Sequence, residues 1–400
     1  MTTAGPVVDD HSPLRMAGRS GEWLVEPGFG VYVHIPFCRH RCHYCDFNTY
    51  EGIADLHAPY VDALEREIRE LAGEMPAATS VFFGGGTPTL LPPSALARLL
   101  AAVRARVGLA PGAEVTVEAN PETVDAGIFE ALLLAGANRF SIGIQSLEPT
   151  VLERLGRRHS VDTATAAVRA ARTAGVGDLN IDLIYGSPWE TDDAWERTLG
   201  AALDLEPDHI SAYSLMVEPG TPLATLVTTG REPDVDPDVQ AARYDRADAV
   251  LAAAGYARYE ISNWSRPGRA SRHNLLYWSA GDYVGLGAGA HGHRSGRRSW
   301  VVRLPRDYIE RVERGEPTEA GSESLGPKAR ADEAVMLGLR LASGIDRRAF
   351  RARFGVDPLG GREGAAAEME LAGALRVDDA RVALEPGALF VANEILARLL

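Results

Sequence analysis

The chain carries its three cysteines within eight positions, and no other cysteine occurs in its 400 residues: Cys38, Cys42 and Cys45. Three thiolates on one short loop could bind three corner irons of a cubane cluster and leave the fourth iron open for a small chelating ligand. A zinc site would instead need a fourth ligand, which His34, His40 or His43 could supply. A disulfide would leave one thiol over. The spacing alone favours an iron-sulfur cluster and leaves the zinc site open.

Composition excludes several classes of protein. Hydrophobic residues make up 46% of the chain, yet no run of about 18 apolar residues could span a bilayer. The net charge of -14 disfavours nucleic acid as a partner, because phosphate contacts require a basic surface. The first residues lack the apolar core of a secretory signal. We therefore expect a cytoplasmic protein with reduced cysteines, and leave peripheral contact with a membrane open.

Strand-like and helix-like segments alternate from residue 31 to about residue 214. The strand-like runs are 31–35, 80–83, 114–118, 139–144, 179–185 and 209–215. Amphipathic helical patterns separate them at 60–71, 94–107, 126–134, 161–173 and 193–203. Such alternation predicts βαβ units and a parallel sheet. An incomplete barrel and a doubly wound sheet both fit this pattern.

Polar groups and glycines cluster at the predicted carboxyl ends of these strands. The cysteine loop follows the first strand, and a Gly-Gly-Gly-Thr segment that begins at Gly84 follows the second. Glu118 ends the third strand, Gln145 follows the fourth and Asp182 lies late in the fifth. The carboxyl ends of parallel strands meet at one rim, where α/β proteins bind their ligands. We therefore expect a binding pocket there, beside the cysteines.

These segments resemble a known family. Tyr32-Val-His-Ile-Pro-Phe-Cys, the cysteine triplet with Tyr44 before its last member, and the glycine segment are similar to the radical S-adenosylmethionine superfamily. Together with Ile142-Gly-Ile-Gln-Ser, Leu155-Gly-Arg-Arg-His and Asn180-Ile-Asp-Leu-Ile-Tyr-Gly, they resemble the branch that contains oxygen-independent coproporphyrinogen III oxidase and the HemW-type haem chaperones. The resemblance implies an α/β fold, namely an incomplete (β/α)6 TIM-like barrel with a small helical, winged-helix-like C-terminal domain.

The resemblance also implies two cofactors and their ligands. A [4Fe-4S] cluster would be bound by the three cysteines, with the amino and carboxylate groups of S-adenosylmethionine on its open iron. The residues implied around S-adenosylmethionine are Tyr32, Tyr44, Gly85, Gly86, Thr87, Glu118, Gln145, Arg157 and Asp182. For Arg157, an exposed helical position is an equal alternative.

Two features discriminate within the branch. The oxidase has a fourth cysteine two positions after the third, where this chain has Phe47. The segment His273-Asn-Leu-Leu-Tyr-Trp278 resembles a motif of the chaperone group. A neutral imidazole is a good axial ligand for haem iron, so we expect His273 to contact haem and Tyr277 and Trp278 to lie against the porphyrin. The alternative is that His273 only makes local hydrogen bonds.

Arginines flank this segment in an otherwise acidic chain. The six are Arg266, Arg269, Arg272, Arg294, Arg297 and Arg298. Guanidinium groups pair well with carboxylates, so this basic island is a hypothesis for the site of the haem propionates. A solvated charged loop is the alternative.

The resemblance implies the function of a haem chaperone, which binds haem and delivers it to acceptor proteins, with respiratory and membrane-associated proteins among the expected acceptors. An electron donor is expected if the cluster is reduced. The alternative is an oxygen-independent coproporphyrinogen III oxidase, so whether the chain is an enzyme stays open and no catalytic residue is predicted. The predicted division comprises an extension (1–28), the radical S-adenosylmethionine core (29–259), a linking segment (260–309) and the C-terminal helical domain (310–400).

Overall fold

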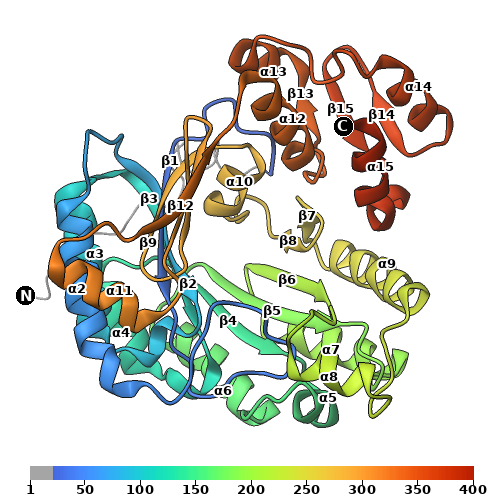
Figure 1. Ribbon diagram of the computed structural model, residues 1–400. Helices are drawn as coiled ribbons and strands as arrows, with labels where there is room; N and C mark the ends of the chain where they lie inside the picture. The colour runs from blue at the N-terminus through green and yellow to red at the C-terminus, as the bar shows by residue number, and fades with distance from the viewer. Residues whose placement is uncertain (1–20) are drawn as a thin grey trace, which may run out of the picture.

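The computed structural model describes residues 21–400, so most of the predicted extension at 1–28 lies outside the described residues. Within this range, a twelve-stranded sheet has the order β12-β11-β10-β9-β1-β2-β3-β4-β5-β6-β8-β7. Its central part consists of six parallel strands (Figure 1). These are β1 (Phe29–Ile35), β2 (Ala78–Gly85), β3 (Leu109–Ala119), β4 (Arg139–Gln145), β5 (Leu179–Tyr185) and β6 (His209–Ser214).

Helices connect the parallel strands and pack on the outer side of the curved sheet (Figure 1). They are α2 (His57–Glu70), α3 (Pro93–Arg106), α4 (Ala126–Ala135), α5 (Pro149–Arg154), α6 (Val161–Thr173) and α7 (Asp192–Asp204). Short 3-10 turns precede three of them, η1 (Ala54–Leu56), η2 (Pro88–Leu90) and η3 (Pro121–Thr123). After β6 follow α8 (Pro222–Thr228) and α9 (Pro237–Ala253). The predicted alternation of strands and helices is therefore confirmed.

The spatial order of the six strands follows their order in the chain, and β1 and β6 do not pair with each other. A doubly wound sheet would reverse its strand order at a switch point, so that alternative is wrong. The sheet is curved but open, as the incomplete barrel requires. Beyond β6, the short strands β8 (Asn263–Ser265) and β7 (Ala257–Arg258) continue the sheet in antiparallel fashion.

A distant part of the chain extends the sheet beyond β1. Strand β9 (Asp282–Leu286) pairs with β1 in parallel, and β10 (His291–Arg294), β11 (Arg297–Val301) and β12 (Glu319–Ser324) follow in antiparallel order. Helix α10 (Arg272–Trp278) precedes β9, and α11 (Pro305–Arg314) separates β11 from β12. Residues 260–309 thus contribute strands to the same sheet as the core, while the predicted division of the chain stays a prediction.

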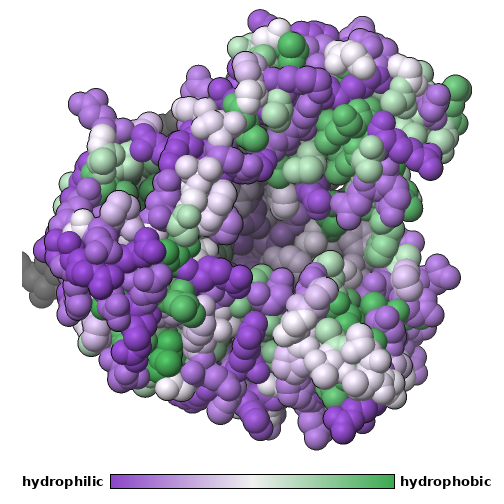
Figure 2. All heavy atoms as spheres, in the orientation of Figure 1, coloured by the Kyte–Doolittle hydropathy of each residue, from purple (hydrophilic) through white to green (hydrophobic). Residues whose placement is uncertain are grey.

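The C-terminal region combines helices with a small sheet of order β13-β15-β14. Its helices are α12 (Pro327–Gly338), α13 (Arg347–Phe354), α14 (Glu363–Leu371), η4 (Pro386–Val391) and α15 (Ala392–Leu399). Its strands are β13 (Ile345–Asp346), β14 (Leu375–Val377) and β15 (Arg381–Leu384). The face drawn in Figure 2 is deeply hollowed between this region and the large sheet. Among the helices of residues 21–400, none is long and apolar enough to cross a membrane.

A candidate cluster and nucleotide site beside an aromatic cavity

The cysteine loop lies between β1 and η1, at the carboxyl end of the parallel strands. Each sulfur faces a different polar group. Thr87 Oγ1 donates a hydrogen bond to Cys38 Sγ at 3.7 Å, and Arg157 Nη1 donates to Cys42 Sγ at 3.4 Å. Thr49 Oγ1 lies 3.8 Å from Cys45 Sγ. Hydrogen bonds to cysteine sulfurs tune the potential of an iron-sulfur cluster, so the loop offers three thiol groups and three tuning partners.

The donor set fits a cubane better than a single zinc ion. Within residues 21–400, no three His, Cys, Asp or Glu side chains converge as ligands of one metal ion. A cubane has no such requirement, because each thiolate binds a separate iron. Of the histidines considered for zinc, both His34 ring nitrogens are hydrogen-bonded, to Tyr32 Oη and Asn48 O, and His43 Nδ1 lies 3.2 Å from Arg154 O.

Backbone hydrogen bonds hold the cysteine loop at its base and at its middle. Cys38 N donates to Tyr50 O at 2.9 Å, and His43 N donates to Leu155 O at 3.1 Å. Burial is the main factor that raises the pKa of Cys38 to about 11. A metal that binds this sulfur would stabilise the thiolate and reverse the shift.

The glycines at the end of β2 let the chain pass close to β1 and to the residue that precedes Cys38. Gly86 N donates to Ile35 O at 2.8 Å, and a Cβ atom at position 86 would lie 2.6 Å from Phe37 O. Gly85 has φ = +111°, a conformation that favours glycine, and a Cβ there would meet the His34 ring at 2.3 Å. The glycines therefore permit close packing of this segment against β1 and Phe37, whereas an approach of their amides to a ligand stays a prediction.

Two carboxyl groups come from two strands of the sheet, Glu118 from the end of β3 and Asp182 from the middle of β5. Glu118 accepts a hydrogen bond from Gly85 N at 3.0 Å. Burial and, second, the charge of Asp182 raise the pKa of Glu118 to about 8. Asp182 accepts from Asn180 Nδ2 at 2.7 Å and from Ser141 Oγ at 3.0 Å, and burial raises its pKa. These two groups can accept hydrogen bonds from the hydroxyl or ammonium groups of a ligand.

Gln145 lies at the end of β4, Arg157 beyond α5 and Tyr44 in the cysteine loop. Gln145, the last residue of β4, has a left-handed φ of 64°. Arg157 is not an exposed helical residue: Nη2 donates to Gly143 O at 2.7 Å, Nη1 faces Cys42, and its buried Nε has no hydrogen-bond partner among the described residues. Tyr44 packs against an apolar cluster that includes Val151. Arg157 thus contacts the cysteine loop, and Tyr44, itself a residue of that loop, packs it against the apolar cluster.

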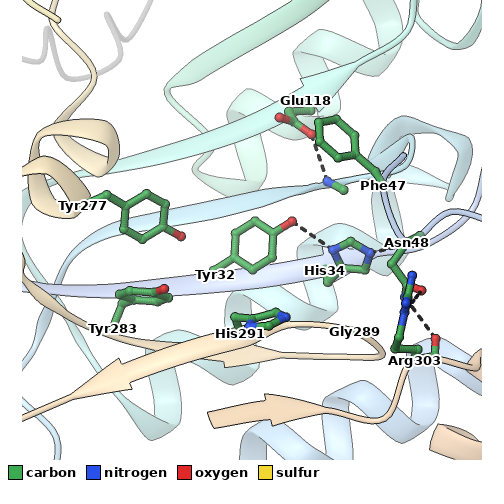
Figure 3. A pocket seen from close by; sticks show the side chains of 11 residues that line it. Tyr32, His34, Phe47, Asn48, Glu118, Tyr277, Tyr283, Gly289, His291 and Arg303 are labelled. Carbon is green, nitrogen blue, oxygen red and sulfur yellow. Dashed lines mark hydrogen bonds between the residues drawn. The ribbon is translucent and has the colours of Figure 1, made fainter. Parts of the chain in front are cut away.

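A cavity of about 480 Å³ adjoins the same strand ends (Figure 3). The residues that line it are Tyr32, His34, Phe47, Asn48, Gly85, Glu118, Tyr277, Tyr283, Gly289, His291 and Arg303. Tyr32, Gly85 and Glu118 belong to the predicted nucleotide set, whereas Tyr277 belongs to the predicted haem set. The cavity therefore joins the two predicted sites.

The predicted haem residues behave differently from one another. His273 is only 1% exposed, and its Nδ1 and Nε2 lie 2.9 Å from Ser80 Oγ and 2.8 Å from Tyr277 Oη. Burial lowers the pKa of His273 to about 4, so its ring is neutral. Trp278 does not line the cavity, and the Arg340 guanidinium lies 5.6 Å from its ring centroid. Of the three, only Tyr277 reaches the cavity, and a role of His273 as an iron ligand stays a prediction.

Helix α10 explains why His273 is buried. The Glu114 carboxylate, buried on β3, accepts hydrogen bonds from the backbone N–H groups of Arg272 at 3.0 Å and His273 at 3.1 Å. A carboxylate at a helix N-terminus satisfies free N–H groups and interacts favourably with the helix dipole. Glu114 therefore fixes the start of the helix, and the helix places Tyr277 at the cavity wall.

The proposed basic island does not line the cavity. Arg297 forms an ion pair with Glu319 at 2.5 Å, and Arg298 pairs with Glu323 at 2.8 Å and with Glu333. Arg303 is instead the arginine at the cavity rim. Arg303, Tyr283 and Asn48 were not predicted as site residues, because they come from separate segments without a shared motif.

Comparison with known proteins places the chain in a family. Residues 32–202 match the radical SAM superfamily model, and residues 325–391 match the HemN C-terminal domain. The haem chaperone HemW of Mycobacterium tuberculosis is 46% identical over 323 residues, which cover 79% of this chain and 83% of that protein. HemW of Escherichia coli is 40% identical, covering 71% of this chain and 76% of that protein.

A solved structure supports the fold. Coproporphyrinogen III oxidase (HemN) from Escherichia coli, described as a radical SAM enzyme, superposes with a TM-score of 0.79 at 22% identity and covers 95% of this chain and 92% of its own. At that identity the likeness establishes the incomplete barrel and the C-terminal domain rather than the activity. A radical SAM domain implies S-adenosylmethionine and a [4Fe-4S] cluster. The sequence relatives reach much higher identity over most of the chain, and by that measure the chain belongs to the HemW haem chaperone family of the radical SAM superfamily.

Proposed function

We propose that the chain is a haem chaperone, which binds haem in the aromatic cavity beside its cluster and nucleotide site and delivers it to acceptor proteins. One observation carries the proposal. Tyr277, from the segment that resembles the chaperone motif, lines the same cavity as Tyr32, Gly85 and Glu118 of the predicted nucleotide site. The names of the relatives in Mycobacterium tuberculosis and Escherichia coli support haem as the ligand.

The cavity suits a porphyrin in its chemistry. Tyr32, Tyr277 and Tyr283 offer aromatic faces, which pack well against a flat conjugated ring. Phe47 adds an apolar side chain that is 64% exposed, an unusual position for so large a hydrophobic group. A planar apolar ligand at this place would cover the Phe47 ring and remove it from water.

Phe47 also bears on the alternative function. In the oxidase branch the resemblance implies a further cysteine at this position, so an apolar contact here replaces a thiol. A coproporphyrinogen III oxidase remains the second candidate, because its solved structure shares the whole fold. The higher identity to the chaperones favours haem delivery.

The cluster and nucleotide would be held by the residues at the strand ends. In this proposal Cys38, Cys42 and Cys45 bind the [4Fe-4S] cluster, and its open iron supplies a chelation site for S-adenosylmethionine. Glu118 and Asp182 accept hydrogen bonds from the nucleotide. The set is completed by Tyr32, Tyr44, Gly85, Gly86, Thr87, Gln145 and Arg157.

The three cysteines form no disulfide with one another, which agrees with a reducing compartment as the proposed setting. We place the chaperone in the cytoplasm, in peripheral contact with a membrane where it meets acceptors. Respiratory haem proteins are the acceptor class we propose, and an electron donor is required if the cluster is reduced.

The deciding experiment compares two activities of the anaerobically reconstituted protein. One sample is titrated with haem and then mixed with an apo-haem protein, while the other receives coproporphyrinogen III, S-adenosylmethionine and a reductant. We expect haem to bind and transfer, without decarboxylation. Turnover to protoporphyrinogen IX would establish the oxidase instead, and failure to bind haem would refute the chaperone.

A further inference from the structure

We propose that His291 is an axial ligand of haem iron in the aromatic cavity, a role that rests on the proposed haem-binding function. The proposal follows from which imidazole nitrogens are free. Three histidines lie at or next to the cavity, namely His34, His273 and His291. Ligation of iron requires a ring nitrogen whose lone pair is available.

His34 has no available nitrogen. Its Nε2 lies 3.0 Å from the carbonyl oxygen of Asn48, which can only accept, so Nε2 carries the proton. Its Nδ1 then accepts from Tyr32 Oη at 2.9 Å. Burial lowers the pKa of His34, which keeps the ring neutral in this arrangement. Iron could bind here only if one of these hydrogen bonds broke.

His273 also has no nitrogen lone pair free for iron. Its two nitrogens face the hydroxyl groups of Ser80 and Tyr277, so its lone pair accepts from one of them in either tautomer. Its main effect on the cavity is through Tyr277, whose hydroxyl it holds in place. His273 is therefore a positioning residue in this structure.

His291 differs from both. His291 is exposed and lines the cavity. No hydrogen bond joins its ring to any other described residue. The ring lies 6.2 Å from that of Trp300 at an interplanar angle of 30°, which supports one side of the imidazole. Figure 3 shows its ring on the cavity floor near Tyr32, between Tyr283 and Gly289. A neutral imidazole in this position can donate a lone pair to iron.

The glycine-rich segment before His291 explains its placement. A Cβ atom at Gly285 on β9 would lie 1.9 Å from His291 O, so glycine permits β10 to approach β9 closely. Gly289 has φ = +80°, and a Cβ there would meet Asn48 Nδ2 at 2.3 Å. These two glycines allow the start of β10 to lie against the side of the cavity that adjoins the cysteine loop.

Arg303 supplies the matching charge. Its exposed side chain lies at the cavity rim, and its Nε donates a 3.4 Å hydrogen bond to Asn48 Oδ1. No ion pair of Arg303 occurs among the residues that the structure describes. A guanidinium at the rim can pair with a haem propionate once the iron is bound to His291. The binding step forms one Fe–N bond, releases a weakly bound axial ligand such as water, and changes no oxidation state.

The test separates iron ligation from porphyrin binding. Full-length wild-type protein and the His291→Ala variant are titrated with ferric haem and, separately, with metal-free protoporphyrin IX. We expect the variant to lose ferric haem affinity by on the order of 10- to 100-fold, the range typical of a lost metal-site partner. We expect its protoporphyrin affinity to stay within about twofold of wild type, because that ligand has no iron to bind.

A matched control lies on the same strand. His293, two residues along β10, faces Gly281 O at 3.2 Å and does not line the cavity, so His293→Ala should leave the haem spectrum unchanged. A His291→Gly variant should regain the wild-type Soret spectrum when free imidazole is added, which also guards against misfolding. An unchanged haem spectrum and affinity in His291→Ala would overturn the ligand role alone. A wild-type protein that fails to bind haem would refute the proposed function as well.

Discussion

The cysteine loop and the aromatic cavity are adjacent, but they differ in how the chain forms them and in how far their polar groups are already hydrogen-bonded. The loop is one continuous segment, and each of its three sulfurs already faces a hydroxyl or guanidinium group. The cavity is assembled from β1, α10, β9 and β10, and His291, which lines it, makes no ring hydrogen bond to the rest of the described chain. Under the proposed function, this difference separates a preorganised site for a resident cofactor from an open site for a cargo that has to leave.

Tyr32 and His34 connect the two regions. Tyr32 Oη lies 2.9 Å from His34 Nδ1, and His34 Nε2 donates to Asn48 O, which follows the cysteine loop. Asn48 in turn donates to the carbonyl oxygens of Ala288 and Arg303 on the cavity side. These hydrogen bonds join the cysteine loop directly to the residues that line the cavity.

The largest effect is expected at the cluster. Cys42→Ser should abolish the iron-sulfur absorbance of the reconstituted protein, since no other cysteine can replace the lost thiolate. Haem affinity should change by less than about threefold if the two sites use separate ligands. Asp46→Asn, on an exposed residue of the same loop, is the control and should keep the cluster. If Cys42→Ser lost haem binding together with the cluster, the cysteine loop and the cavity would not be separate sites.

A second, smaller effect should follow from Gly86→Ala. The added Cβ would lie 2.6 Å from Phe37 O and 2.9 Å from Ile35 O. Both are backbone atoms, so no side-chain rotation can relieve the clash. We expect a loss of about 1–3 kcal/mol in the free energy of unfolding and a less complete cluster. Denaturant unfolding and iron content measure the two effects. Gly200→Ala, where nothing lies within 4 Å of the added atom, is the matched control, and equal effects in both variants would contradict the prediction.

The smallest effect is a pH dependence. Because the pKa of Glu118 is raised to about 8, mainly by burial, this carboxyl is largely protonated at neutral pH. A cationic nucleotide favours the ionised form, so S-adenosylmethionine affinity should rise with pH, by at most about tenfold per unit, and level off above pH 8.

Glu118→Gln isolates this contribution. The amino group of the ligand titrates equally with both proteins, so the difference between their pH profiles belongs to Glu118. Calorimetric titrations in two buffers of different ionisation enthalpy would count the released proton. Identical profiles for the two proteins would remove Glu118 from the nucleotide site.

Sequence patterns predicted the two regions unequally. The cysteine loop and its glycine neighbours could be predicted because the residues that form them are consecutive, and alternating periodicity located the six parallel strands β1 to β6. Pairing of β9 with β1 could not be predicted, since periodicity identifies strands but not their distant partners. For the same reason Arg303 and Tyr283 were missed. Burial of His273 was also not predicted, because it depends on Ser80 and Glu114 beneath α10.

The most direct test of the central claim is a haem titration of the anaerobically reconstituted protein, followed by desalting and assay of haem and acid-labile sulfide. Two adjacent sites with separate ligands predict stoichiometric haem uptake with undiminished sulfide content. Haem uptake that releases sulfide would contradict the account, because it would mean that the cysteines bind the haem and that loop and cavity form one site.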